Sequence, residues 1–242
     1  MSSELQIRVY FPLGADFVTN PELVFYGRYI SFLRNLYCVS SEKKCFTCTF
    51  SKGCRFHQMT GEYFDHYPGI LVKTDYFIKK RYSKNEELSL RFLFVGNTEK
   101  VIDSALIFFK EHLGQKIAGF FFCIKDYSIT IVEEKVVSGE SLRFISPVCN
   151  QSVSVILEEM ISYYNKSYRT DYALPAAEVV SGELNLQKRT GYKIAGKYIK
   201  LDGYVGLVKG RFEQIPWIAA EYGLGINNCI GGGQFEIKDF IT

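Results

Sequence analysis

The 242-residue sequence has few histidines, a small net charge and no long apolar run, and each shortage narrows what it can do. Only three histidines are present, so chemistry that depends on an imidazole has few possible positions. A net charge of +3 is too small to indicate a nucleic-acid partner by itself. No apolar segment approaches bilayer length, and the N-terminus lacks a basic region followed by an apolar core. We therefore expect a soluble, cytoplasmic protein with no membrane partner.

Low-complexity and proline-rich segments are also missing, which excludes a largely disordered chain. Hydrophobic residues make up 47% of the sequence, with many Tyr and Phe, so the chain can bury a sizeable core. The length fits one large domain or two ordinary ones. An internal similarity favours two.

The C-terminal stretch 203–237 and the middle stretch 88–124 share one order, namely a strand, an amphipathic helix and a glycine-containing return into another strand. Aligning the two stretches pairs Gly96 with Gly210, Gly114 with Gly223 or Gly225, and Gly119 with Gly231, Gly232 and Gly233. This similarity indicates two copies of one module. We expect a boundary near Ser138-Gly139, with domains at 1–138 and 139–242.

Hydrophobic periodicity and helix-start signals predict the remaining elements. For the first half they predict a strand at 5–11, a helix at 23–37 capped by Asn20, strands at 70–78 and 88–95, a helix at 98–112 and a strand holding Gly119. For the second half they predict a strand at 142–148, a helix at 153–168, two strands between Glu178 and Tyr198, and then the C-terminal module. Both halves follow the split βαβ, or ferredoxin-like, order. We therefore predict an α+β fold of tandem duplicated ferredoxin-like (RRM-like) domains with a C-terminal glycine-rich loop.

The glycine-rich loop contains Gly225, Gly231, Gly232 and Gly233. Its backbone is expected to turn with positive φ or to allow a close approach. Consecutive N–H groups in such a loop can bind phosphate. A bulged hairpin at a sheet edge is the alternative interpretation.

Two basic stretches are interleaved with or flanked by tyrosine. From 188 to 201 there are five cations and no acid, with Tyr192 and Tyr198 between them: Lys188, Arg189, Lys193, Lys197 and Lys200. The second cluster contains Lys79, Lys80, Arg81 and Lys84. Cations with aromatic rings suit single-stranded or looped RNA, although a solvated strand face has the same composition.

The first domain is expected to carry a cysteine-rich insertion at about 38–68. It holds four of the seven cysteines, Cys38, Cys45, Cys48 and Cys54, and His57 follows. A Cys-x-x-Cys pair with further soft ligands nearby is typical of a tetrahedral zinc site, which in a reducing compartment is favoured over disulfides. An iron–sulfur cluster is the weaker alternative, and loop thiols without a metal are another. Either Cys38 or His57 can complete a set of four.

Several segments, in the same order, resemble the CRISPR-associated endoribonucleases that cut repeat RNA, the Cas-six family of the RAMP superfamily. The segments are Tyr26-Gly27-Arg28 through Leu36-Tyr37-Cys38, the cysteine loop, Phe94-Val95-Gly96, Leu142 to Val148, Gly203–Gly206 and the terminal glycine loop. The resemblance covers nearly the whole chain. It implies cleavage of CRISPR repeat RNA without a catalytic metal, by attack of a 2′-OH that leaves a 2′,3′-cyclic phosphate.

Such cleavage requires an acid, a base and a positive charge for the phosphorane. His66 lies between the expected first helix and second strand, where several members of the family place their active-site histidine. His66, then His57, are therefore the candidate acid or base; His112 is interpreted as a helix cap. Tyr26 or Tyr29 is a candidate partner, although plain packing is the alternative for each. Lys73 or Arg28 is the candidate phosphorane stabiliser.

Two other functions fit the sequence. The scarcity of histidine favours an inactive subunit that holds guide RNA within a CRISPR effector complex, whose other subunits would then be partners. A zinc-stabilised scaffold for a protein partner leaves the basic strands and the glycine loop unexplained.

Overall fold

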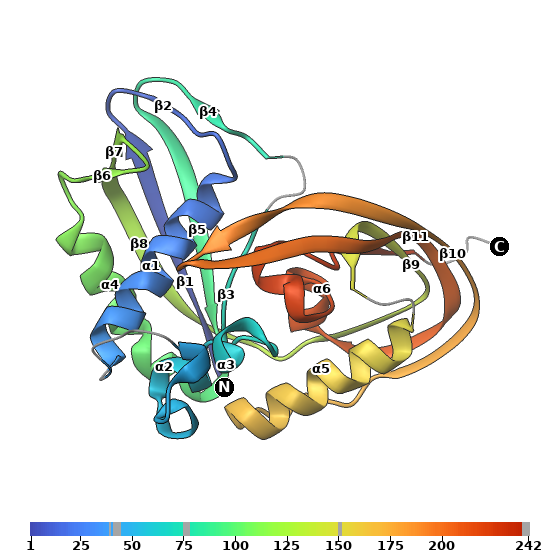
Figure 1. Ribbon diagram of the computed structural model, residues 1–242. Helices are drawn as coiled ribbons and strands as arrows, with labels where there is room; N and C mark the ends of the chain where they lie inside the picture. The colour runs from blue at the N-terminus through green and yellow to red at the C-terminus, as the bar shows by residue number, and fades with distance from the viewer. Residues whose placement is uncertain (39, 41–44, 75–77, 150–151, 239–242) are drawn as a thin grey trace.

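The chain forms a mixed α/β structure whose two four-stranded antiparallel sheets lie side by side (Figure 1). The computed structural model describes residues 1–38, 40, 45–74, 78–149 and 152–238, and the side chains of Phe46, Lys188, Arg189 and Thr190 fall outside that description. Within these ranges no helix is long and apolar enough to cross a membrane.

The N-terminal sheet has the strand order β3-β5-β1-β8. Its strands are β1 (Ser2–Phe11), β3 (Ile70–Val72), β5 (Glu86–Phe94) and β8 (Cys123–Val132). Helices α1 (Pro21–Tyr37) and α4 (Ile102–Glu111), the latter preceded by the 3-10 turn η3 (Gly96–Val101), pack against it. Aromatic rings fill the layer between, as where Phe25 stacks on Phe109 with centroids 5.9 Å apart.

The C-terminal sheet has the strand order β10-β11-β9-β12. Its strands are β9 (Val136–Val148), β10 (Ala176–Ile194), β11 (Lys197–Pro216) and β12 (Phe235–Lys238). Helices α5 (Val153–Tyr168) and α6 (Trp217–Tyr222), with the 3-10 turn η4 (Ile226–Ile230), accompany it. If the four strands of each sheet are numbered by their order along the chain, both sheets have the spatial order 2-3-1-4.

Short elements connect these parts of the fold. The cysteine segment contains η1 (Cys45–Thr47), η2 (Ser51–Gly53), α2 (Arg55–Met59) and α3 (Gly61–Phe64). Two small two-stranded sheets complete the fold: β2 (Ala15–Asp16) pairs with the distant β4 (Arg81–Tyr82), and β6 (Lys116–Ile117) forms a hairpin with β7 (Phe120–Phe121).

Both long helices confirm the sequence pattern. Asn20 caps α1 by accepting a hydrogen bond from the Leu23 N–H at 3.1 Å, and Pro21 opens the helix. Helix α5 covers the expected residues 153–168. It packs across both halves, because the Tyr168 hydroxyl donates to the Tyr67 carbonyl at 2.9 Å.

Three predictions about strands need correction. Gly119 does not lie within a strand but between β6 and β7, with φ of +90°. Residues 178–194 belong to one strand rather than two, and the expected strand at 203–210 is the middle of β11. The second strand is described only from Ile70 to Val72, and residues 75–77 lie outside the described residues. Ser138 and Gly139, where we expect the domain boundary, lie in the first strand of the C-terminal sheet, and the last strand of the N-terminal sheet ends at Val132; the boundary stays a prediction.

The β10–β11 hairpin is long enough to reach from the C-terminal sheet to α1 in the other half (Figure 1). Its turn, Ala195-Gly196, lies there: the Ala195 carbonyl accepts a hydrogen bond from Arg34 Nη1 at 2.8 Å. Ile194 is buried and lies 3.7 Å from where a Cβ on Gly27 would be. We call residues 194–197 the hairpin tip.

Candidate functional site

The hairpin tip meets an unusual turn at α3. Gly61, Glu62, Tyr63 and Phe64 all have positive φ, between +50° and +67°, so four consecutive residues are left-handed. Each non-glycine residue in this conformation costs about 1–2 kcal/mol, and such strain is typical of functional sites. Gly61 has no substitute, because a Cβ there would lie 2.5 Å from the His66 carbonyl oxygen.

Side chains and backbone of the hairpin tip hold this left-handed turn. The Tyr63 hydroxyl donates to the Ala195 carbonyl at 2.6 Å. Lys197 Nζ donates to the Tyr63 carbonyl at 3.0 Å and to Asp65 Oδ1 at 2.5 Å. The Lys197 side chain is only 17% exposed. The C-terminal half thereby fixes the segment that carries Glu62, Asp65 and His66.

Two imidazoles lie around this turn. His66 is 49% exposed, its Nε2 lies 3.6 Å from Glu62 Oε2, and its ring stacks on Tyr163 of α5 with centroids 5.3 Å apart. His57, on α2, is half-buried, and burial lowers its pKa; the carboxylates of Glu62 and Asp65 act in the opposite direction. The structure thus brings together His66, His57 and Lys197, which the sequence had singled out separately.

Neither tyrosine proposed as a catalytic partner fits that role. Tyr26 is fully buried, and its hydroxyl donates to the Ile70 carbonyl at 2.7 Å. Tyr29 is also buried, with its hydroxyl 2.9 Å from Ser104 Oγ. Burial raises the pKa of both phenols far above the ordinary value. Both hydroxyls are engaged inside the core, which favours the packing alternative over the catalytic assignment.

Lys73 and Arg28 lie apart from the histidines. Lys73 Nζ donates to the backbone carbonyl of Glu221 on α6 and lies 3.2 Å from its carboxylate, so its charge is already paired. Arg28 is exposed on α1. Among the described cations, Lys197 is the one that acts on His57, where its charge lowers the pKa.

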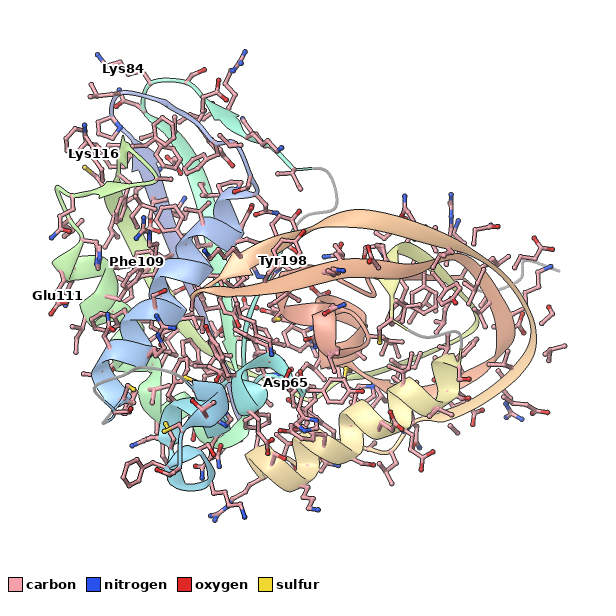
Figure 2. The ribbon with its side chains drawn as sticks, viewed as in Figure 1. Asp65, Lys84, Phe109, Glu111, Lys116 and Tyr198 are labelled. Atoms are coloured by element: carbon pink, nitrogen blue, oxygen red, sulfur yellow. The ribbon has the colours of Figure 1, made fainter. Side chains whose placement is uncertain are left out.

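The basic stretches divide into free and paired cations. Lys193 and Lys200 are exposed, as is Tyr198, whereas Lys197 is held by Asp65. The side chains of Lys188 and Arg189 lie outside the described residues. In the second cluster Lys79 pairs with Glu86, Arg81 with Asp16 at 3.0 Å, and Lys80 donates to the Val18 carbonyl. Figure 2 shows Lys84, of that cluster, at the end of the N-terminal sheet far from Asp65.

The glycine-rich loop does not offer the expected row of free N–H groups. Gly231, Gly232 and Gly233 are buried, and their N–H groups donate to the carbonyls of Asn228, Asn227 and Pro147. Gly225 is buried as well, and a Cβ there would lie 2.8 Å from Cys149 Sγ. A Cβ on Gly233 would lie 1.9 Å from the Leu224 carbonyl oxygen. These contacts favour close backbone packing over phosphate binding as the reason for the glycines.

The four clustered cysteines come together at one place. Cys38, Cys45, Cys48 and Cys54 line a cavity of about 20 Å³, and His57 lines it too. That volume suits a single ion or water. The four thiols are free, and burial raises the pKa of Cys45. As the side chains stand, the described residues hold no set of three or more His, Cys, Asp or Glu groups already arranged around an ion.

No protein-family model matches the sequence, and no curated protein matches it. Several solved structures are similar to this chain. One of them is a Cas6 protein in a product complex, with a TM-score of 0.55 at 10% identity; the match covers 97% of this chain and 99% of the Cas6 chain.

The chain has the Cas6 fold. A Cas6-related protein from Pyrococcus furiosus gives a TM-score of 0.53 at 10% identity, covering 99% of this chain and all of its own. A RAMP protein described as binding different RNA substrates gives 0.52 at 11% identity, covering 98% of this chain and all of its own. The resemblance to the Cas-six family is confirmed in the fold, over nearly the full length of the Cas6 and RAMP chains.

Sequence reasoning missed Glu62, Asp65 and Tyr163, which contact the histidines and Lys197 in this Cas6 fold. Glu62 and Asp65 flank Tyr63-Phe64, and only the left-handed turn determines where they point. Tyr163 is half-buried at helical spacing from core residues of α5, so its pattern indicates packing. None of the three carries a local signal for a site.

Proposed function

We propose that the protein is a metal-independent endoribonuclease that cuts CRISPR repeat RNA, with a 2′-OH as nucleophile and a 2′,3′-cyclic phosphate and 5′-OH as products. The observation that carries this proposal is the half-exposed imidazole of His66 beside Glu62, close to His57 and Lys197, in a chain with the Cas6 fold.

His66 and His57 share the acid and base roles in this proposal, with His66 the first candidate. General acid and base groups must reach the 2′-OH and the leaving 5′ oxygen, and an exposed imidazole on a short connection can do so. Glu62 orients His66 by its 3.6 Å contact. Lys197, through Tyr63 and Asp65, keeps the turn in place.

The outer face of the β10–β11 hairpin is the proposed path for the repeat RNA. Lys193 and Lys200 are exposed for phosphates, and Tyr198 offers a half-exposed ring for an unstacked base. The two sheets, each with the same strand order, are interpreted as tandem ferredoxin-like copies.

We also propose that Cys38, Cys45, Cys48 and Cys54 hold a structural zinc ion. The chemistry of four thiols around one ion-sized cavity supports this, since zinc takes four thiolates at about 2.3 Å. Rotation of the thiols toward the cavity would be required. This ligand set leaves His57 for the RNA.

The experiment is cleavage of a labelled CRISPR repeat RNA in chelator by the wild type, His66→Ala and His57→Ala. We expect a cyclic-phosphate product from the wild type and loss of at least 100-fold in rate on His66→Ala. His112→Ala is the matched control, because His112 lies at the end of α4, where its contacts are the Phe108 carbonyl and the Phe108 ring. An unchanged rate for both His66→Ala and His57→Ala would refute the assignment.

A guide-RNA-holding subunit of a CRISPR effector complex is the second candidate. The likeness to a RAMP protein described as binding different RNA substrates favours it. It predicts tight binding of repeat RNA by the wild type and no product in the same assay.

A further inference from the structure

A polar pocket of about 530 Å³ opens beside the left-handed turn, where α2, η3 and the last turn of α5 meet. Four cations from these three elements line it: Arg55, Lys100, Lys166 and Arg169. Glu62 is the one acid among its lining residues. We call this the basic pocket. Figure 1 shows the end of α5 approaching α2 and α3 there.

The four cations are not compensated by acids. None of them forms an ion pair with any residue in the described ranges, and all four are exposed. Like charges that converge on a concave surface raise the local positive potential and attract anions. By contrast, three of the cations at the other end of the sheet, Lys79, Lys80 and Arg81, have partners within the protein.

One of these cations occupies a position that a glycine would fill more easily. Arg169 ends α5 with φ of +57°, a left-handed conformation usually taken by glycine or asparagine. Arg169 thus combines a strained backbone conformation with a charged side chain that lines the pocket. This indicates that the guanidinium has a use there.

The basic pocket is continuous with the candidate site. Glu62 lines the pocket and contacts His66, and Tyr163 lines the pocket and stacks on the same imidazole. A strand that places a phosphate at His66 can therefore continue into the pocket without leaving the surface. The volume suits one or two nucleotides, and the polar lining excludes an apolar ligand.

We propose that the basic pocket binds the single-stranded RNA that continues from the scissile phosphate, with phosphates on Arg55, Lys100, Lys166 and Arg169 and a base against Tyr163. This rests on the proposed function for the position of the scissile phosphate. Single-stranded nucleic acids are bound elsewhere by cations together with aromatic side chains, and here the half-buried Tyr163 is the tyrosine that both lines the pocket and contacts His66. The hairpin and the basic pocket then hold the strand on either side of His66.

The test compares Lys166→Ala/Arg169→Gly with a control that removes the same two charges elsewhere, Lys110→Ala/Lys116→Ala. Arg169→Gly keeps the positive φ without strain, so the variant is expected to fold. Figure 2 shows Lys116 far from Asp65 and the turn. Binding of labelled repeat RNA is measured in chelator between 50 and 300 mM salt, with the uncut RNA and with each of its two halves.

We expect the basic-pocket variant to bind roughly 10-fold more weakly, with a salt slope reduced by about 1.4, because each single-strand phosphate contact contributes about 0.7. The loss should appear for one half of the RNA only, and the control should match the wild type. Equal binding by both double variants would overturn the proposal, even if the RNA is cut. Binding of poly-glutamate is measured in the same way. A basic-pocket variant that loses affinity for poly-glutamate but not for RNA would overturn the proposal in favour of an acidic protein partner. Binding that follows the prediction without any product would uphold the basic pocket and refute only the nuclease.

Discussion

We expect the Lys197 side chain to stabilise the folded site, and the Lys193 side chain, on the same hairpin, to affect only RNA binding. Lys197→Met removes the bonds from Nζ to the Tyr63 carbonyl and to Asp65, together with the contact of the ammonium with the Tyr63 ring, while the methionine keeps a side chain of similar length. The first bond contributes roughly 1 kcal/mol. Asp65 is 59% exposed and regains water, so that bond contributes only about 0.2–1 kcal/mol.

We therefore expect Lys197→Met to lower the free energy of unfolding by about 1–2 kcal/mol in urea titrations. Because the left-handed turn loses a support, single-turnover cleavage should fall on the order of 10-fold. Lys193→Met is the matched control: Lys193 is exposed and has no ion-pair partner among the described residues. It should change stability by less than about 0.5 kcal/mol and reduce the salt slope of RNA binding by about 0.7.

The comparison can fail in two ways. Equal losses of stability for the two variants would show that the hairpin tip does not support the turn. A Lys197→Met protein that is as stable as the wild type, but weakened in RNA binding like Lys193→Met, would make Lys197 a simple phosphate contact.

Three further outcomes follow from the same structure. Gly61→Ala should destabilise the protein by more than about 3 kcal/mol in urea titrations, because φ is positive and the Cβ would lie 2.5 Å from the His66 carbonyl; a Gly53→Ala control, with open space around it, should be near neutral. Tyr26→Phe should cost about 1 kcal/mol of stability and leave cleavage within twofold, whereas a large loss of rate in a stable variant would restore its catalytic assignment. Protein purified with zinc should contain about one ion per chain by elemental analysis, and Cys45→Ser/Cys48→Ser should lose it while Cys123→Ser does not; equal zinc in both variants would contradict the ligand set.

The long helices could be predicted because their signals are local. The pair Asn20-Pro21 predicts the start of α1, and the apolar residues of α5 recur at helical spacing over its whole length. The strand errors have a physical cause as well. Residues 178–187 alternate poorly because they belong to the edge strand β10 and are mostly exposed on both faces, so no buried face enforces a pattern.

The site was only partly predictable, because its geometry depends on contacts distant in sequence. His66 and Lys197 were chosen separately, and the Tyr63–Ala195 hydrogen bond that relates them spans 132 residues. For Tyr26 and Gly231 the sequence left a functional role and a packing role open. The sequence pattern is the same for both roles, and only the fold shows that these two residues are buried.

The hairpin tip has a consequence for synthesis of the chain. The left-handed turn is complete once residue 64 has been made, but the Ala195 carbonyl and the Lys197 ammonium that hold it come more than 130 residues later. At about 5–20 residues per second, the ribosome adds that stretch in roughly 7–26 s. During this interval the nascent N-terminal half carries His57 and His66 without the contacts that orient them. Under the proposed function, a product that ends before Ala195 lacks these contacts and is expected to have no nuclease activity.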